Sequence, residues 1–90
     1  MLEILEQLIK TIRERKNSPS DNSYTSKLLT DKNLSVAKVK EEIRELIEAV
    51  EKDTNKIHEA ADVIYHLMVY LEANNIKIED VMNELKKRQK

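Results

Sequence analysis

The 90-residue chain contains no cysteine, glycine, tryptophan or phenylalanine, and it has a single proline. The absence of cysteine excludes disulfides and thiolate metal sites, and it agrees with a reducing compartment. The absence of glycine leaves little with which to build the tight turns of a strand-rich protein. The composition therefore predicts one all-α domain that covers residues 1–90.

The chain also lacks a charge excess and a long apolar run. Its net charge is -1, so no overall field would attract nucleic acid or a membrane surface. The longest stretch without a charged side chain runs from Val63 to Leu71, far below the ~18 to 20 residues that span a bilayer. The start, Met1 to Glu6, places acids among its apolar residues, unlike a signal peptide. We expect a cytoplasmic protein with neither nucleic acid nor membrane as a partner.

Apolar residues at helical spacing predict a bundle of four main helices and one short helix. The first main helix is expected over about residues 2–16, and Ser23 is a candidate N-cap for a short helix that runs to about Thr30. After a connection at 31–34, Ser35 is the predicted N-cap of the second main helix. Asp53 to Asn55 separate it from a third helix that runs to about Ala73, and the last helix covers about 78–88.

The helix that ends near Ala73 is apolar on nearly all sides. Between Ala60 and Leu71 only four residues carry polar side-chain atoms: Asp62, Tyr65, His66 and Tyr70. A helix of this kind is normally buried on both faces, and a 90-residue bundle has little material with which to bury it. We therefore predict a homodimer or a higher homo-oligomer that completes the bundle.

Two acidic patterns lie on consecutive predicted helices. Glu42 and Glu45 form an ExxE pair, and Glu59 and Asp62 form an ExxD pair. Residues three apart share one side of a helix, so an antiparallel hairpin would bring the four carboxylates together. Such a cluster needs a cation, and oxygen ligands without cysteine favour Mg²⁺ or Mn²⁺. The usual ligand of such an ion is a polyphosphate.

Purely structural interpretations of the same residues remain as alternatives. Acidic side chains are common on helices, and the spacing alone favours a metal site no more than a solvated face. Asp62 favours the metal site, because a carboxylate on so apolar a helix is costly without a partner. His66, one turn later, is expected to hydrogen-bond to Asp62 rather than to bind metal. Lys38 and Glu42, four apart, could form no more than a weak surface pair.

Three longer segments narrow the possibilities: Ser-Tyr-Thr-Ser-Lys-Leu-Leu at 23–29, Lys-Val-Lys-Glu-Glu-Ile-Arg-Glu at 38–45, and Glu-Ala-Ala-Asp-Val-Ile-Tyr-His-Leu at 59–67. They closely resemble the phosphoribosyl-ATP pyrophosphohydrolase family, and the segments at 11–16 and 78–85 are similar to it as well. The acidic patterns alone indicate only the wider superfamily of all-α nucleoside triphosphate pyrophosphohydrolases. The Ser-Tyr-Thr segment and the Asp-x-x-Tyr-His run point to this member.

The resemblance implies Mg²⁺-dependent cleavage of phosphoribosyl-ATP to phosphoribosyl-AMP and pyrophosphate, the second step of histidine biosynthesis. It also implies dimers that form four-helix-like bundles. Its metal carboxylates fall on Glu42, Glu45, Glu59 and Asp62. Glu41 and Glu45 become candidates for accepting a proton from the attacking water, and His66 would support Asp62. Phosphate contacts are expected from Lys27, Lys38 and Arg15.

The chain departs from the family pattern at two places near the acidic residues. Ala37 to Lys40 replace a common Lys-Lys-Val-Gly, and Asp31 to Asn33 stand where a glycine is usual. Both departures concern phosphate contacts and loop geometry and leave the acidic patterns complete. The alternatives are a house-cleaning pyrophosphatase that acts on other nucleotides and a non-catalytic helical oligomerisation module. The next enzyme of the pathway, a phosphoribosyl-AMP cyclohydrolase, is expected to be a separate protein.

Overall fold

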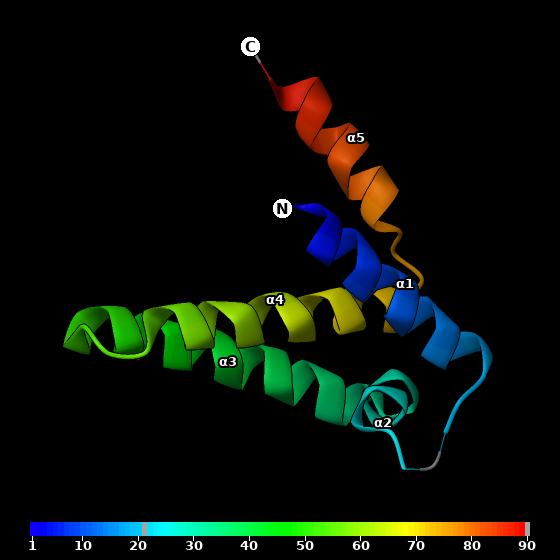
Figure 1. Cartoon of the computed structure of the whole chain (residues 1–90), viewed down its shortest axis with the longest axis horizontal. Helices are drawn as coiled ribbons and strands as arrows, with labels where there is room; N and C mark the ends of the chain where they lie inside the picture. The colour runs from blue at the N-terminus through cyan, green and yellow to red at the C-terminus, as the bar shows by residue number, and fades with distance from the viewer. Residues whose placement is uncertain (21, 90) are drawn as a thin grey trace.

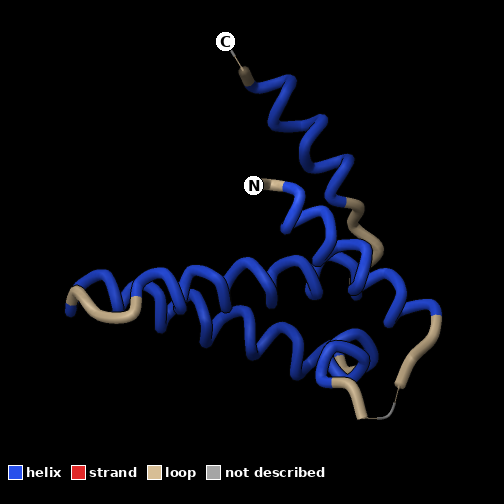
Figure 2. The backbone as a smooth tube through the Cα atoms, viewed as in Figure 1, coloured by secondary structure: helices blue, strands red, loops and turns tan. Residues whose placement is uncertain are grey.

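The computed structural model describes residues 1–20 and 22–89, and within them it contains only helices and connections (Figures 1 and 2). The helices are α1 (Glu3–Asn17), α2 (Tyr24–Thr30), α3 (Lys32–Lys52), α4 (Lys56–Ala73) and α5 (Ile78–Arg88). The all-α class and the order of four main helices and one short helix are therefore confirmed.

The start of α3 differs from the prediction. Ser23 caps α2 as expected, because its hydroxyl accepts a hydrogen bond from the amide of Ser26. Asp31 then caps α3 directly, since its Oδ1 accepts a hydrogen bond from the amide of Leu34 at 3.1 Å. The predicted connection at 31–34 and the predicted N-cap at Ser35 were wrong. Aspartate and serine are both good caps, and the earlier one begins the helix here, which leaves Ser35 buried within α3.

Left-handed backbone conformations fall on Asp and Asn, because the chain has no glycine. Asp53 (φ 56°) and Asn55 (φ 45°) turn the chain between α3 and α4, and Asn75 (φ 59°) follows α4. Asn and Asp tolerate this region better than other residues with a Cβ. Asn55 occupies the cap position of α4, but its side chain makes no capping hydrogen bond. The break predicted from Asp53 to Asn55 is thus confirmed. It arises from left-handed backbone conformations rather than from side-chain capping.

The helices α3 and α4 form a long antiparallel hairpin, and α1 and α2 pack near the end of it that lies away from the 53–55 turn (Figure 1). The core lies where α1, α2 and α4 meet. Its buried residues are Ile9, Ile12, Leu28, Met68 and Val69. The helix α5 projects away from the hairpin, beside the start of α1. The half of the hairpin nearer the 53–55 turn is therefore covered by neither α1 nor α2.

Burial of α4 on both faces is only partly observed in the single chain. Val69 is fully buried, but other apolar side chains of the hairpin remain exposed by 43% to 88% of their surface: Ile43, Ile47, Val50, Ile57 and Ile64. Exposed apolar surface of this extent usually marks an interaction site. Among the described residues, no helix combines the length and the apolarity that a membrane crossing requires.

Candidate functional site

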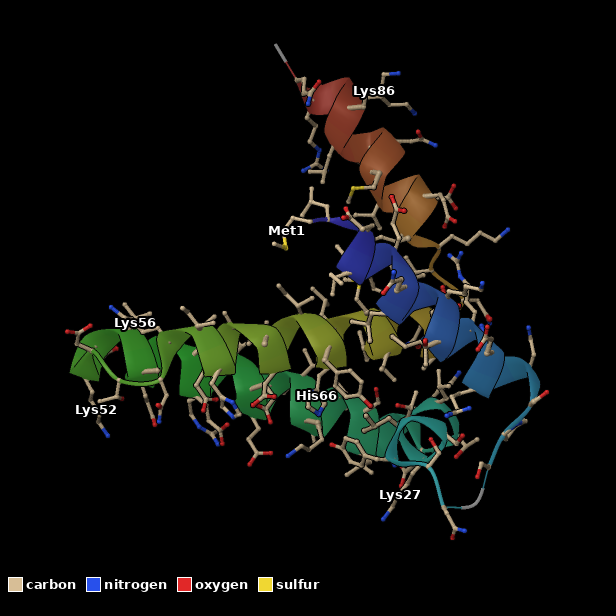
Figure 3. All side chains as sticks on the ribbon, viewed as in Figure 1. Met1, Lys27, Lys52, Lys56, His66 and Lys86 are labelled. Carbon is tan, nitrogen blue, oxygen red and sulfur yellow. The ribbon has the colours of Figure 1, made fainter. Side chains whose placement is uncertain are left out.

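Three of the predicted carboxylates converge between the two helices of the hairpin. Glu42 and Glu45 come from α3 and Glu59 from α4, and one carboxylate oxygen of each lies within 4.8 Å of the others. The three-residue spacing on α3 places Glu42 and Glu45 on one side, and the antiparallel partner brings Glu59 opposite them. In Figure 3 the tip of the hairpin is marked by Lys52 and Lys56, and His66 lies further along α4.

Asp62 belongs to a second group that shares Glu59 with the first. Here His58, Glu59 and Asp62 each offer a ligand atom within 4.8 Å of the others. The Nε2 atom of His58 lies 3.3 Å from Oδ2 of Asp62. His58 was not among the predicted site residues. Its four-residue spacing from Asp62 was the available signal, because residues four apart in a helix are neighbours.

The interior of this cluster is electrostatically unfavourable as it stands. Glu42 is only 6% exposed, and its Oε2 atom has no hydrogen-bond partner among the described residues. The same holds for Oε2 of Glu59. Burial raises the pKa of Glu42, and the nearby charge of Glu45 raises it further. Burial and Glu45 also raise the pKa of Glu59, since both effects disfavour the charged form.

A divalent cation fits this set of donors. Oxygen ligands from carboxylates are those that Mg²⁺ and Mn²⁺ prefer. The two oxygens without partners are shielded from solvent, so water does not satisfy them either. A cation would offset the like charges and supply the missing partners. The carboxylates of Glu42, Glu45, Glu59 and Asp62 are the groups that could hold it.

Lys38 and Glu41 adjoin the cluster on α3 and form an ion pair. The ammonium of Lys38 lies 2.7 Å from Oε2 of Glu41 and 3.6 Å from Oε1 of Glu42. The contact with Lys38 lowers the pKa of the Glu41 carboxyl and raises the pKa of the Lys38 ammonium. The predicted pair of Lys38 with Glu42 is thus present, but Glu41 is the closer partner.

His66 is buried and contacts Asp62 through the main chain. Its Nδ1 atom lies 2.8 Å from the main-chain oxygen of Asp62, and its Nε2 atom lies 3.0 Å from the hydroxyl of Tyr24. The expected hydrogen bond to Asp62 therefore exists, but it leaves the carboxylate free for other partners. Tyr24 joins the site through this contact, and the Ser-Tyr-Thr segment was the sequence signal for it.

Within the part of the chain that the structure describes, the other basic residues predicted for phosphate contacts form no ion pair with the carboxylate cluster. Arg15 on α1 and Lys27 on α2 are exposed, and neither forms an ion pair with another described residue. Figure 3 shows Lys27 directed outward from α2. Their role in binding phosphate stays a prediction.

Two hollows differ in their relation to the carboxylates. A groove of about 770 Å³ between α1 and α5 is mainly apolar and contains none of the predicted ligands. A smaller hollow of about 180 Å³ lies at the closed end of the hairpin and is lined by Glu45, Glu59 and Thr54, among others. The smaller one adjoins the candidate site, since two of the clustered carboxylates line it and convergent polar groups rather than volume identify where the chemistry occurs.

The chain is similar to proteins of one family over almost its whole length. The family model described as phosphoribosyl-ATP pyrophosphohydrolase matches residues 5–89. The phosphoribosyl-ATP pyrophosphatase of Clostridium acetobutylicum is 49% identical over 92 aligned residues, which cover 96% of this chain and 81% of that protein. The protein of the same name from Clostridium novyi is 43% identical, with 99% of this chain and 84% of the relative covered.

A longer relative is also similar to this chain. The histidine biosynthesis bifunctional protein HisIE of Pyrococcus furiosus is 43% identical over 99% of this chain, which spans 43% of that protein. The family match covers almost the whole sequence, and the relatives named phosphoribosyl-ATP pyrophosphatase align over most of their own length. The chain therefore belongs to the phosphoribosyl-ATP pyrophosphohydrolase family.

Proposed function

We propose that this protein hydrolyses phosphoribosyl-ATP to phosphoribosyl-AMP and pyrophosphate in a Mg²⁺-dependent reaction, as the second step of histidine biosynthesis. The observation that carries the proposal is the convergence of Glu42, Glu45 and Glu59 with two buried oxygens that lack partners. The names of the relatives support the choice of substrate. In a non-catalytic module, such a cluster of like charges between the two helices of the hairpin would only be destabilising.

The four carboxylates of the two groups would hold the metal. When bound, Mg²⁺ offsets the charge of the triphosphate and polarises the phosphorus that water attacks. Mn²⁺ is expected to substitute, because it takes the same oxygen ligands. No cysteine or serine nucleophile is needed, since phosphoryl transfer depends mainly on positioning and charge neutralisation.

Glu45 is the better candidate of the two predicted proton acceptors. Its carboxylate lies in the cluster with Glu42 and Glu59, whereas Glu41 is bound by the ammonium of Lys38. That contact lowers the pKa of Glu41 and with it the basicity of its carboxylate. Glu41 would instead hold Lys38 in place until a phosphate oxygen of the substrate replaces it as the partner. Lys27 and Arg15 would contact phosphate from the exposed side.

We also propose a homodimer formed through the apolar face of the hairpin. Ile43, Ile47 and Val50 of α3 and Ile57 and Ile64 of α4 are exposed in the single chain, and a second copy would cover them as a four-helix bundle. Ile47→Glu should shift the protein from dimer to monomer in analytical ultracentrifugation, with Glu48→Gln as the matched exposed control. A monomeric wild-type protein at micromolar concentration would contradict the dimer.

The deciding experiment measures pyrophosphate release from phosphoribosyl-ATP and from a panel of ordinary nucleoside triphosphates, each with and without Mg²⁺. Metal-dependent release from phosphoribosyl-ATP alone is the expected result. Release from the ordinary nucleotides instead would move the protein to the house-cleaning branch with the same cluster. Release from none of them would leave an oligomerisation module.

Within the proposed pathway, a phosphoribosyl-AMP cyclohydrolase on a separate chain would take the product, in the cytoplasm.

A further inference from the structure

Two consecutive residues at the start of α2 are tied to two consecutive residues of α4. The hydroxyl of Tyr24 lies 3.0 Å from Nε2 of His66, and Oγ1 of Thr25 lies 2.5 Å from the hydroxyl of Tyr65. Both contacts join segments about forty residues apart in the sequence. They fix the short helix against α4, one turn beyond Asp62.

The direction of the first hydrogen bond follows from its neighbour. The main-chain oxygen of Asp62 can only accept, so Nδ1 of His66 carries the hydrogen of that 2.8 Å bond. In the neutral imidazole, Nε2 is then an acceptor, and Tyr24 donates its hydroxyl hydrogen to it. The hydroxyl of Tyr24 is therefore committed to a buried histidine, and this commitment fixes the position of the ring.

The ring of Tyr24 is held in place although much of it is open. It stacks on Tyr65 with ring centroids 6.3 Å apart and planes 19° apart, and it meets His66 edge-on with centroids 5.8 Å apart. Even so, the residue remains 47% exposed. An exposed tyrosine normally keeps freedom of its side chain, whereas this one presents an aromatic surface that is already ordered. Ordering before binding lowers the entropic cost of recognising a flat ligand.

This surface continues the polar seam of the hairpin. Along α3, Glu45 and Glu42 are followed toward α2 by Lys38, and along α4, Asp62 is followed by His66. Four residues of helix correspond to about 6 Å. The seam therefore presents, in order, carboxylates suited to a metal and its polyphosphate, an ammonium, and the ring that His66 holds. That order matches the chemistry of a nucleotide from its phosphates to its base.

We propose that the purine ring of the nucleotide substrate stacks on the open surface of Tyr24, with the polyphosphate over the carboxylate cluster. Tyr24 is then the residue that recognises the base, and His66 is a positioning residue that acts through it. Aromatic side chains bind bases in this way because every base offers a flat π surface. The inference rests on the proposed function and names the part of the site that reads the base.

The test compares a ligand that has the base with one that lacks it. Affinities for phosphoribosyl-AMP and for pyrophosphate, both with Mg²⁺, are measured by calorimetry on the wild type, Tyr24→Phe and Tyr24→Leu. Tyr24→Leu should weaken phosphoribosyl-AMP binding by about tenfold to a hundredfold and leave pyrophosphate binding unchanged. Tyr24→Phe keeps the stacking ring but loses the hydrogen bond to His66 that positions it, so its affinity for phosphoribosyl-AMP should lie between those of the wild type and Tyr24→Leu. In hydrolysis, Tyr24→Leu should raise KM more than it lowers kcat.

A structural strut between α2 and α4 would behave differently. Its loss would weaken both ligands alike, and Tyr24→Phe would do as much harm as Tyr24→Leu, because both lack the hydroxyl that reaches His66. That pattern would overturn the inference. Tyr70→Phe, a change of the same size on α4, serves as the control and should alter neither affinity.

A measurement on the wild type covers the case in which Tyr24→Leu fails to fold. Purine stacking should move the ring-proton resonances of Tyr24 upfield when phosphoribosyl-AMP binds, whereas pyrophosphate should not; Tyr24→Phe assigns the signals. Unmoved resonances at saturation would overturn the inference. Failure of the wild type to hydrolyse phosphoribosyl-ATP would instead overturn the proposed function. An active wild type with unchanged base affinity in Tyr24→Leu would refute the stacking role alone.

Discussion

Glu42 and Glu72 are both buried carboxylates on helices of the hairpin, with 6% and 8% of their surface exposed, yet their surroundings are opposite. Oε2 of Glu72 accepts a hydrogen bond from Nε of Arg13 at 3.0 Å, and the ammonium of Lys16 lies 3.9 Å from its Oε1. Glu42 faces Glu45 and Glu59 and keeps one oxygen without a partner among the described residues. Glu72 is hydrogen-bonded to an arginine and has a lysine nearby, whereas the one cation near Glu42 among the described residues is the ammonium of Lys38 at 3.6 Å, which lies closer to Glu41.

The pKa values of the neighbouring groups differ in the same way. Arg13 also binds both carboxylate oxygens of Glu79, at 2.9 Å and 2.6 Å, and this lowers the pKa of Glu79 to about 2. In the cluster, burial and like charge raise the pKa of Glu42 and of Glu59. At the junction of α1, α4 and α5, ion pairs therefore hold the helices together. In the cluster, the charged carboxylates repel one another, and an added cation would offset that repulsion.

The largest expected difference between the two regions is in catalysis. Asp62→Asn and Glu42→Gln should each lower kcat for phosphoribosyl-ATP by roughly 10²–10³, because each removes charge from the set that holds the metal. Glu72→Gln, an equivalent change at the other buried carboxylate, should retain activity at a temperature where it is folded. Steady-state pyrophosphate release measures the rates, and far-ultraviolet circular dichroism checks that helix content is unchanged. Near-wild-type turnover of Asp62→Asn would remove Asp62 from the ligand set.

The next largest expected effect is a gain in stability when the metal binds. A ligand that binds only the folded protein stabilises it by about 2.7 kcal/mol at a hundred times its dissociation constant. We expect Mg²⁺ or Mn²⁺ to raise the free energy of unfolding of the wild type, measured by urea titration, and to have little effect on Glu42→Gln. Glu72→Gln should respond to Mg²⁺ as the wild type does. An equal response of Glu42→Gln and the wild type would place the ion elsewhere.

The sequence predicted the cluster and its need for a cation, but not which of its oxygens lack hydrogen-bond partners among the described residues. Three-residue spacing on two consecutive helices is enough to place Glu42 and Glu45 on one side and Glu59 opposite them, once the hairpin is assumed. Whether an oxygen finds a partner depends on packing across the seam, which periodicity does not describe. The contact between Tyr24 and His66 likewise depends on packing between helices, whereas the contact of His58 with Asp62 follows from four-residue spacing within α4.

The other buried carboxylate was not predicted at all. Glu72 is an ordinary glutamate in the last turns of a helix, and its partners Arg13 and Lys16 lie 59 and 56 residues away in the sequence. Local patterns report contacts within a helix, whereas this contact depends on how α1 crosses α4. The wrong start of α3 has a different cause: Asp31 and Ser35 are both acceptable caps, and only the packing of the α2–α3 connection decides between them.

In the absence of metal, the same two substitutions should change stability in opposite directions. Glu72→Gln leaves Arg13 and Lys16 without their buried carboxylate and should lower the free energy of unfolding by about 1–3 kcal/mol. Glu42→Gln removes one of the like charges and should raise it by about 0.5 kcal/mol. Urea unfolding of both variants in a metal-chelating buffer gives the comparison. A loss of stability in Glu42→Gln similar to that in Glu72→Gln would show that the contact of Glu42 with Lys38 outweighs the repulsion from Glu45.

The smallest expected effect is the dependence of stability on pH, in which the two regions again act in opposite directions. Glu79 binds fewer protons in the folded state, because its pKa falls from an ordinary value of 4.5 to about 2, so its contribution is lost as pH falls between these values. Glu42 and Glu59 bind more protons in the folded state, because their pKa values are raised. Their contribution is present below 4.5 and is lost as pH rises through the raised values.

Variants and metal separate these two limbs of the stability curve. Glu79→Gln should flatten the acid limb, and Glu42→Gln should flatten the decline above it. Saturating Mg²⁺ should also abolish that decline in the wild type, because a bound cation favours the charged carboxylates that the metal-free cluster disfavours. The free energy of unfolding, measured from about pH 3 to 8 with and without Mg²⁺, tests all three expectations. A decline that persists unchanged in Mg²⁺ would mean that the buried carboxylates of the seam are not where the cation binds.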